Sequence, residues 1–268
     1  MNKVGKIILL ITIITVPVMF YFYFNFLERG KSFITKGEAP SLKAEKKTQV
    51  VLIFDDLGEN LRELKKIYAL KIPVTVAVIP HLRFSKNIAS IASRCGYSVL
   101  VHLPMEPKER LSSFLRYRNK FITTDLSLRK LNYLLKYHLN SLRVAIGANN
   151  HMGSKATENE RVMRAVIKAI RVRNMVFVDS KTSPNSLACQ IAKEEGVKCA
   201  ENSGFLDSRS SPKEIKDTLY SLLAKADKEG RVIIIAHPRE NTFKVLEEEL
   251  PKIKEKVEFI TLKDYFGL

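Results

Sequence analysis

The chain reads VVLIFDD from Val50 to Asp56, a run of five large apolar residues closed by two adjacent carboxylates. Three of the five are β-branched, so the run favours a buried strand. Asp55 and Asp56 would then stand at the carboxyl end of that strand, directly before Leu57-Gly58. This combination of an apolar run and a polar end sets the pattern for the rest of the fold.

The same pattern recurs along the chain. Further strand-like apolar runs cover residues 74–79, 97–101, 144–148, 175–178, 231–236 and 257–262, with a weaker one near 197–200. Amphipathic helical patterns separate them at residues 61–68, 85–94, 127–142, 158–173, 186–195, 212–228 and 242–256. Apolar strands that do not alternate strictly, separated by helices, indicate a parallel sheet covered on both faces. About seven such units predict a barrel or an open doubly wound sheet.

Length and charge bound the class of protein. With 268 residues, 46% of them hydrophobic, the chain can place one α/β domain in residues 49–268. Lys and Arg outnumber Asp and Glu by 45 to 28, for a formal net charge of +17, which favours anionic partners. No zinc-finger spacing or RNA-binding aromatic motif accompanies the charge, so nucleic acid is not an expected partner.

The amino terminus predicts a membrane segment. Residues 7–26 contain no charged side chain and are long enough to cross the bilayer as a helix. Lys3 and Lys6 precede the run, and no small-residue cleavage pattern follows it. We therefore expect a transmembrane signal anchor in residues 1–27, retained rather than cleaved, and a flexible basic linker in residues 28–48. The domain would lie outside the cytoplasm, in the periplasm or at the cell surface.

Polar strand ends indicate where a functional site lies. In barrels and open α/β sheets, sites are built at the carboxyl edge of the strands. A single polar end is usually a turn, a helix cap or a structural histidine. Here the ends together supply three aspartates and three histidines, namely Asp55, Asp56, His102, His151, Asp179 and His237. Imidazoles together with carboxylates suit zinc, so the set predicts hydrolytic metal chemistry.

Two segments around these histidines carry further expectations. His102 opens the segment 102–107, whose two prolines predict a shaped loop, and Glu106 offers a second ligand from it. Residues 147–154 read GANNHMGS, and two Asn between Gly residues predict unusual backbone angles and tight packing around His151. The latter segment can also be read as an ordinary turn.

The remaining histidines and the cysteines carry weaker signals. His81 stands at a similar strand end, and His138 falls within a predicted helix, where a structural role is expected. Cys189 and Cys199 can form a bridge between a helix and the next strand, or remain buried small residues. The sequence leaves both open.

Five ordered blocks of this sequence resemble the divergent polysaccharide deacetylase family. They cover residues 54–58, 102–107, 149–154, 177–180 and 236–238, and the resemblance extends over roughly residues 48–265. That family is similar to the NodB-homology group of carbohydrate deacetylases. The resemblance implies an α/β fold of the NodB type, a distorted and incomplete (β/α) barrel of about seven strands.

The resemblance also implies roles for individual residues. Asp55 would be the general base and His237 the general acid. Asp56 and His102 would bind Zn²⁺ or another divalent metal, with His151 as third ligand. Glu106 would be a less certain ligand. Contacts to substrate are expected from Asn150, Asp179 and Ser180.

The implied reaction is removal of acetyl groups from N-acetylated sugars of a polysaccharide or peptidoglycan-type glycan. Two departures from the wider group support an alternative. Glu106 stands where that group has a second metal histidine, and its arginine motif on the next strand has no counterpart in residues 147–154. The alternative is a catalytically inactive envelope protein that binds glycan or a partner on the same fold.

Overall fold

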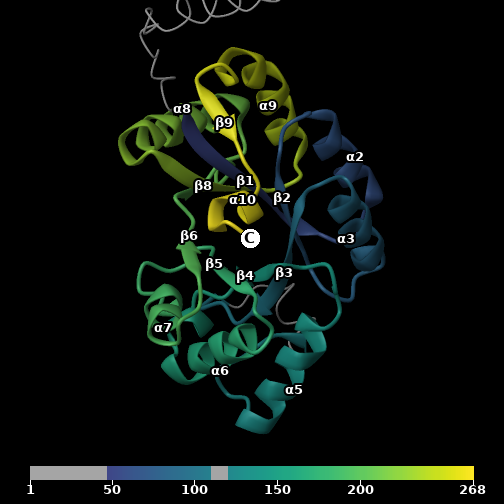
Figure 1. Cartoon of the computed structure of the whole chain (residues 1–268), viewed down its shortest axis with the longest axis vertical. Helices are drawn as coiled ribbons and strands as arrows, with labels where there is room; N and C mark the ends of the chain where they lie inside the picture. Colours follow the sequence, from purple (N-terminus) through teal and green to yellow (C-terminus); the bar gives the residue numbers. More distant parts are fainter. Residues whose placement is uncertain (1–46, 110–119) are drawn as a thin grey trace, which may run out of the picture. The chain divides into compact units, whose positions relative to one another are not determined.

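The apolar runs form a parallel sheet in the computed structural model, which describes residues 47–109 and 120–268 (Figure 1). Among these residues the sheet has nine strands. They are β1 (Thr48–Leu57), β2 (Thr75–Val78), β3 (Ser98–Met105), β4 (Gly147–Met152), β5 (Val176–Asp179), β6 (Cys199–Glu201), β7 (Gly204–Phe205), β8 (Arg231–Ala236) and β9 (Val257–Phe259). The seven predicted runs and the weaker run near 197–200 all correspond to strands, and β7 is an additional one.

The strand order makes the sheet an incomplete barrel. The order is β6-β5-β4-β3-β2-β1-β8-β7, and β9 also pairs with β1. Only Asn202 and Ser203 separate β6 at one edge from β7 at the other. The Asn202 amide donates to Asp179 of β5, and the Ser203 amide donates to Ile233 of β8. The two edges therefore approach each other, which confirms the predicted incomplete (β/α) barrel.

Helices follow most strands. They are α2 (Leu61–Ala69), α3 (Ser85–Arg94), α5 (Leu128–Leu139), the 3₁₀ turn η2 (Ala156–Glu158), α6 (Glu160–Arg171), α7 (Ala188–Glu194), α8 (Pro212–Glu229), α9 (Glu240–Ile253) and α10 (Leu262–Phe266). Several of them begin with a side-chain cap. Before α8, for example, the Ser211 side chain accepts from the Glu214 amide, Pro212 opens the first turn, and left-handed Gly230 ends the helix.

Two buried clusters lie on opposite faces of the sheet. The larger one joins outward side chains such as Val50 and Leu52 to helices α2 through α9. The smaller one contains the alternate residues Val51 and Ile53 together with Leu262 of α10, and Tyr265 and Phe266 of the same helix pack against it. The Leu262 amide donates to the Thr75 hydroxyl at the start of β2. Helix α10 therefore closes the amino ends of the strands, and the carboxyl ends remain available for a site (Figure 1).

Strand β3 continues through the segment that the sequence predicts as a loop. His102, Leu103 and Pro104 pair with β4 in regular register. Pro104 is tolerated because β2 ends at Val78, which pairs with Val101, so no β2 partner needs its missing amide hydrogen. The Pro104 carbonyl oxygen accepts a hydrogen bond from the Ile122 amide. The loop prediction for residues 102–107 was therefore wrong over its first four residues.

Strand β4 likewise includes Asn149, Asn150 and His151, so the alternative of an ordinary turn there was wrong. The expected tight packing is confirmed at Gly147, where an added Cβ would lie 2.4 Å from the Val176 carbonyl oxygen. The expected unusual backbone angles occur at the end of the strand, at its last residue Met152 (φ 56°) and at Gly153 (φ 93°) directly after it.

Cys189 of α7 and Cys199 of β6 form a disulfide, which decides between the two readings of these cysteines. The predicted signal anchor and nearly all of the predicted linker lie outside the described residues. Within the described ranges, no helix combines the length and apolar character needed to cross a bilayer.

Candidate metal centre

Strand periodicity brings the predicted residues to one mouth of the barrel. Side chains alternate along a strand, so a residue two positions beyond an inward-facing core residue points the same way. Ile53, Leu100, Val178 and Ile235 belong to the inner cluster. The residues two positions further along their strands are Asp55, His102, Ser180 and His237.

Asp56 joins this group through an irregularity in β1. Regular alternation would place Asp55 and Asp56 on opposite faces of the sheet. The pairing register with β2 shifts between Phe54 and Leu57, and Asp56 has a left-handed backbone (φ 61°). Aspartate tolerates this conformation better than most residues. Both carboxylates consequently line the same cavity.

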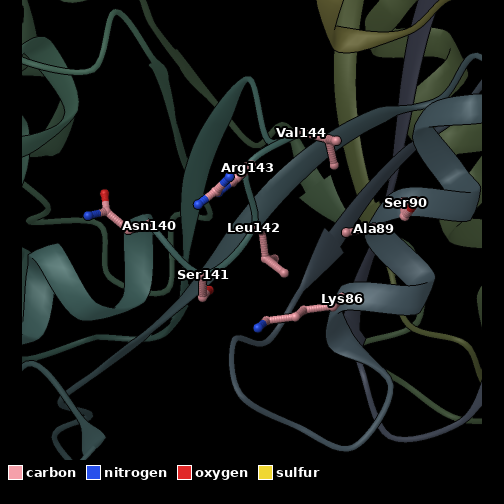
Figure 2. Close-up of a pocket in the computed structure, with 8 residues that line it drawn as sticks. All are labelled: Lys86, Ala89, Ser90, Asn140, Ser141, Leu142, Arg143 and Val144. Carbon is pink, nitrogen blue, oxygen red and sulfur yellow. The ribbon is translucent and has the colours of Figure 1, made fainter.

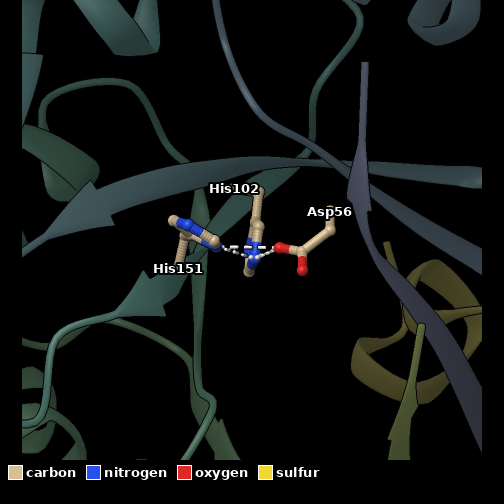
Figure 3. A group of neighbouring side chains, drawn as sticks. All are labelled: Asp56, His102 and His151. Atoms are coloured by element: carbon tan, nitrogen blue, oxygen red, sulfur yellow. Dashed lines mark hydrogen bonds and ion pairs between the residues drawn. The ribbon is translucent and has the colours of Figure 1, made fainter. Parts of the chain in front are cut away.

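Asp56, His102 and His151 converge on one point (Figure 3). The Asp56 Oδ1 atom lies 3.0 Å from His102 Nε2 and 2.7 Å from His151 Nδ1. The two imidazole nitrogens are 3.2 Å apart. These three atoms come from strands β1, β3 and β4, so the sheet itself fixes their spacing.

The triangle of atoms fits a small divalent cation. Zinc bonds of about 2.0 Å in tetrahedral geometry place neighbouring ligand atoms about 3.3 Å apart. The observed separations of 2.7–3.2 Å are close to that edge length and are slightly shorter. One carboxylate and two imidazoles also form a donor set typical of catalytic zinc. Asp56, His102 and His151 therefore form a candidate metal site.

Asn149 orients His102 for this role. Its Oδ1 atom lies 2.9 Å from His102 Nδ1, and an amide oxygen only accepts, so Nδ1 carries the hydrogen. The Nε2 atom is then the one available to a cation. Burial opposes protonation of His102, but the charges of Asp55 and Asp56 outweigh it and raise the pKa to about 9. A bound cation must displace that proton.

The two adjacent aspartates have opposite pKa shifts. Burial raises the pKa of Asp55, and the nearby charge of Asp56 adds to this. Burial acts in the same direction on Asp56, but hydrogen bonds from His102 and His151 hold its pKa well below the usual range. Two carboxylates separated in this way can divide the work of base and ligand. The Asn149 amide group donates to both oxygens of Asp55 at 3.0 and 3.2 Å.

His237 faces the same point from β8. Its Nε2 atom lies 3.8 Å from Asp56 Oδ2, and its Nδ1 atom lies 2.8 Å from Asp207 Oδ1. Burial opposes protonation of His237, but the hydrogen bond to Asp207 outweighs it and raises the pKa. The Asp207 carboxylate also accepts from the His237 amide and from the Thr242 hydroxyl. Asp207 was not predicted from the sequence.

These residues line a cavity of about 350 Å³. Its wall also contains Asn150, Ser180, Thr182, Phe205 and Arg239. Of the three predicted substrate contacts, Asn150 and Ser180 line the cavity, whereas Asp179 does not. Asp179 is buried with the opposite strand parity to Ser180, and its Oδ1 accepts from the Lys181 amide. Asp179 therefore supports the turn after β5, and its prediction as a substrate contact is corrected.

Glu106 is also placed differently from the prediction. Its carboxylate accepts from the backbone and hydroxyl of Thr124, and it pairs with Lys155 at 2.9 Å. Four residues of extended chain span about 13 Å, so Glu106 and His102 cannot hold the same cation while β3 continues between them. The expectation that Glu106 is a ligand is corrected to a structural ion pair.

A further cavity of about 390 Å³ lies beside α3 and the segment that follows α5 (Figure 2). Figure 2 labels all of its lining residues, which include Lys86, Ser90, Asn140 and Arg143. None of them is Asp, Glu, His or Cys, so this cavity offers no ligand set for a metal.

A family model and two relatives match most of this chain. A model described as divergent polysaccharide deacetylase matches residues 52–266. An uncharacterized protein of Haemophilus influenzae is 30% identical over 213 residues, which cover 80% of this chain and 75% of that protein. The Escherichia coli protein YibQ, also named as uncharacterized, is 30% identical over 200 residues, covering 75% of this chain and 61% of YibQ.

A solved structure shares the fold. The crystal structure of an uncharacterized protein of Agrobacterium tumefaciens superposes with a TM-score of 0.73 at 19% identity. The superposition covers 82% of this chain and 89% of that one. With the family model spanning nearly all of the described domain, the chain belongs to the divergent polysaccharide deacetylase family.

Proposed function

We propose that this protein is a metal-dependent hydrolase that removes acetyl groups from N-acetylated sugars of a cell-envelope polysaccharide. The observation that carries the proposal is the convergence of Asp56, His102 and His151 in a cavity also lined by Asp55 and His237. The match to the deacetylase family supports the same reaction class.

The arrangement assigns one task to each group. Zn²⁺ held by Asp56, His102 and His151 would polarise the acetyl carbonyl and lower the pKa of water. Asp55, with its raised pKa, would accept the proton from the attacking water. His237, kept protonated by Asp207, would donate from Nε2 to the departing sugar nitrogen.

We also propose that the domain works outside the cytoplasm and is tethered to a membrane through residues 7–26. The disulfide between Cys189 and Cys199 supports an oxidising compartment. The uncharged run of residues 7–26 supports the tether. The net charge of +17 suits an anionic envelope surface or glycan.

Acetate release tests the activity. The full-length protein loaded with Zn²⁺ should release acetate from an N-acetylated chitooligosaccharide or from peptidoglycan glycan strands. Removal of the metal with a chelator should stop release, and added Zn²⁺ should restore it. A loaded protein that binds either glycan without releasing acetate would instead be the inactive envelope binder, which the changed residue at position 106 favours. Loss of both binding and release would reject both functions.

A further inference from the structure

Helices α5 and α6 carry a strong excess of positive charge. Their sequences contain seven Lys and Arg residues and one acid, Glu160. Helices α8 and α9, which lie at the other end of the sheet, contain six Lys residues and eight acids (Figure 1). The charge of the described domain is therefore unevenly distributed, and its positive end is the one that α5 and α6 form.

The seven cations project away from the sheet. Both helices turn their large apolar residues inward, for example Leu131 and Leu135 of α5 and Val166 and Ile170 of α6. The cations fall between these buried positions, and all of them are exposed, namely Arg129, Lys130, Lys136, Arg161, Arg164, Lys168 and Arg171. A charged outer stripe is ordinary on an amphipathic helix, so the charge alone does not identify a partner.

Exposed apolar side chains gather on the same side of the domain. Nine large hydrophobic residues are exposed in the described part of the chain, and five of them belong to α5, to the C-terminal end of α6 or to the segment between α5 and β4. These five are Leu128, Tyr133, Tyr137, Val144 and Val172. Single exposed apolar residues are ordinary, but a gathering of them among cations indicates a contact surface.

A groove of about 600 Å³ between α5 and α6 brings both kinds of side chain together. Leu128 and Val172 contribute to its wall. Among the described residues, its charged lining consists of five cations and a single acid, namely Lys136, Arg161, Arg164, Lys168, Arg173 and Glu195. Glu195 also pairs with Arg171 at 2.8 Å, so the groove keeps its positive charge.

The cavity of Figure 2 repeats this combination toward α3. Lys86 and Arg143 lie there beside the exposed Val144. The mixture of cations and apolar side chains therefore extends along α5 beyond the groove.

Lys136 and Lys168 are available to bind an anion from outside. Both are exposed, and neither makes a side-chain hydrogen bond or ion pair within the described ranges. Arg161, in contrast, is held by the protein, since its guanidinium donates to the carbonyl oxygens of Leu126 and Thr124 at 3.0 and 2.8 Å. The groove thus combines a fixed cation with two lysines whose flexible stems can adapt to anionic groups.

An anionic phospholipid surface matches this combination. Its headgroups attract basic side chains, and apolar and tyrosine side chains enter the interfacial layer between headgroups and acyl chains. A soluble anionic polymer would pair with the cations but would leave the exposed apolar side chains in water. The proposed tether through residues 7–26 would hold the domain at a bilayer without selecting the face that meets it.

We infer that the face formed by α5 and α6 docks on an anionic phospholipid bilayer, with headgroups bound by Lys136 and Lys168 and with Leu128 and Val172 in the interfacial layer. The inference rests on the tether in the proposed function and adds the orientation of the domain. Helices of a (β/α) barrel surround its strands, so this face leaves the carboxyl ends uncovered. No described residue lines both the metal-site cavity and the groove. The metal site would then open along the membrane surface, where a glycan can reach it.

Fluorescence quenching by lipid tests the orientation. The full-length protein is reconstituted in vesicles of phosphatidylcholine, alone or mixed with anionic phosphatidylglycerol, that contain a lipid with a nitroxide headgroup. A fluorophore is attached through Val172→Cys in a Cys95→Ser background, because Cys95 is the free thiol of the described chain. Glu248→Cys, exposed on α9, carries the control fluorophore. Anionic lipid should increase quenching at position 172 and not at position 248, and high salt should reverse the increase.

Two matched double variants test the lysines. Lys136→Gln combined with Lys168→Gln should reduce quenching at position 172 to the level in neutral vesicles, because each lysine near an anionic surface strengthens docking about fivefold. Lys213→Gln combined with Lys228→Gln makes the same change of charge on α8 and should leave quenching intact. Both should release acetate from a soluble N-acetylated chitooligosaccharide at the wild-type rate, since none of these lysines lines the metal-site cavity.

The outcomes separate this inference from the proposed function. Equal quenching at position 172 in both kinds of vesicle, or quenching that survives loss of Lys136 and Lys168, overturns the docking face. Lysine-dependent binding of soluble hyaluronan without an effect of anionic lipid assigns the face to a glycan and also overturns it. Lysine-dependent docking without acetate release keeps the face and rejects the deacetylase. If the protein does not remain with neutral vesicles, the tether is rejected, and lysine-dependent flotation with added anionic vesicles still decides the face.

Discussion

Two cavities share His151: the metal-site cavity, and a cavity of about 410 Å³, called the second cavity, that His81 and His138 also line. Their buried histidines have opposite pKa shifts. At the metal site, His102 lies 3.0 Å from Asp56 and close to Asp55, and its pKa rises to about 9. In the second cavity, no carboxylate is among the causes that shift the pKa of His138, and burial lowers that pKa to about 4. Both rings are almost fully buried. Neighbouring charge, rather than depth, therefore decides whether a buried histidine is cationic or neutral here.

This difference separates the two cavities. Carboxylates beside imidazoles create a site whose net charge a divalent cation can balance. The cavity beside His138 has Glu59, Arg83 and Lys120 in its wall and, among the described residues, no such cluster of carboxylates and imidazoles. Substitution of one residue at a time in either cavity can therefore test this difference.

The largest effect is expected from Asp56→Ala. Its Oδ1 atom contacts both His102 and His151, so its removal takes one ligand and leaves two adjacent imidazoles without their anion. Zinc affinity should fall more than about 100-fold in a competition titration with a chromophoric chelator. Asp217→Ala, at an exposed carboxylate on α8, is the matched control and should bind zinc as the wild type does. If Asp56→Ala bound zinc as tightly as the wild type, Asp56 would not be a zinc ligand and the proposed metal site would be wrong.

Asp55→Asn separates chemistry from metal binding. Asp55 faces the cavity, but its ionisation is opposed by burial, which suits a base better than a permanent ligand. The rate of acetate release should fall by about 10²–10⁴-fold, while zinc affinity stays within a few-fold of wild type. A parallel loss of zinc would show that Asp55 is a ligand, and a full retention of rate would exclude it as the base.

A smaller and pH-dependent effect is expected from Asp207→Asn. The carboxylate raises the pKa of His237, and as the proposed general acid this histidine would act in its protonated form. Without that charge the pKa falls, so the alkaline limb of the rate profile should move to lower pH. At pH 8 the variant should therefore be slower than the wild type, because a lower pKa leaves a smaller protonated fraction of His237 on that limb. A uniform loss at every pH, with no movement of the limb, would indicate only structural damage.

The sequence predicted the residues that meet at the metal site from the polar ends of its apolar runs. Asp55, His102 and His237 follow apolar runs whose parity points them into the barrel, so their meeting was foreseeable. The prediction that Glu106 is a metal ligand was wrong because the prolines suggested a loop. Instead, β3 continues through Pro104 and places Glu106 away from the cluster. The prediction that Asp179 contacts substrate was wrong because Asp179 and Ser180 are neighbours in the chain, so their side chains point to opposite faces of the sheet.

Two features were beyond reach of sequence patterns. Asp207 follows β7, whose two residues are too short to give a periodic signal, although Phe205-Leu206-Asp207 repeats the apolar-then-acidic pattern in miniature. His138 was correctly expected in a helix. Its bare Nδ1 atom depends on the Lys120 carbonyl and on the wall of His81, which tertiary packing alone brings together.

The last expected effect concerns stability rather than zinc binding or rate, and it tests the difference between His102 and His138 directly in metal-free protein. An unfolded histidine has a pKa near 6.5. As pH falls from 6.5 toward 4, the unfolded chain protonates at position 138 before the folded one, so the free energy of unfolding should fall by about 1.4 kcal/mol per pH unit. His102 has the opposite sign. Its contribution is complete below pH 6.5 and is lost as pH rises toward about 9.

Urea unfolding of full-length protein with a chelator present, from pH 4.5 to 9, measures both limbs. Subtraction of the curve for His138→Gln should flatten the acid limb only, because glutamine keeps an amide hydrogen for the Lys120 carbonyl but takes up no proton. Subtraction of the curve for His102→Gln should flatten the alkaline limb only. If one substitution flattened both limbs, the two histidines would not be electrostatically independent. His151, which lines both cavities, would then be the residue through which the ionisation of His102 and that of His138 are coupled.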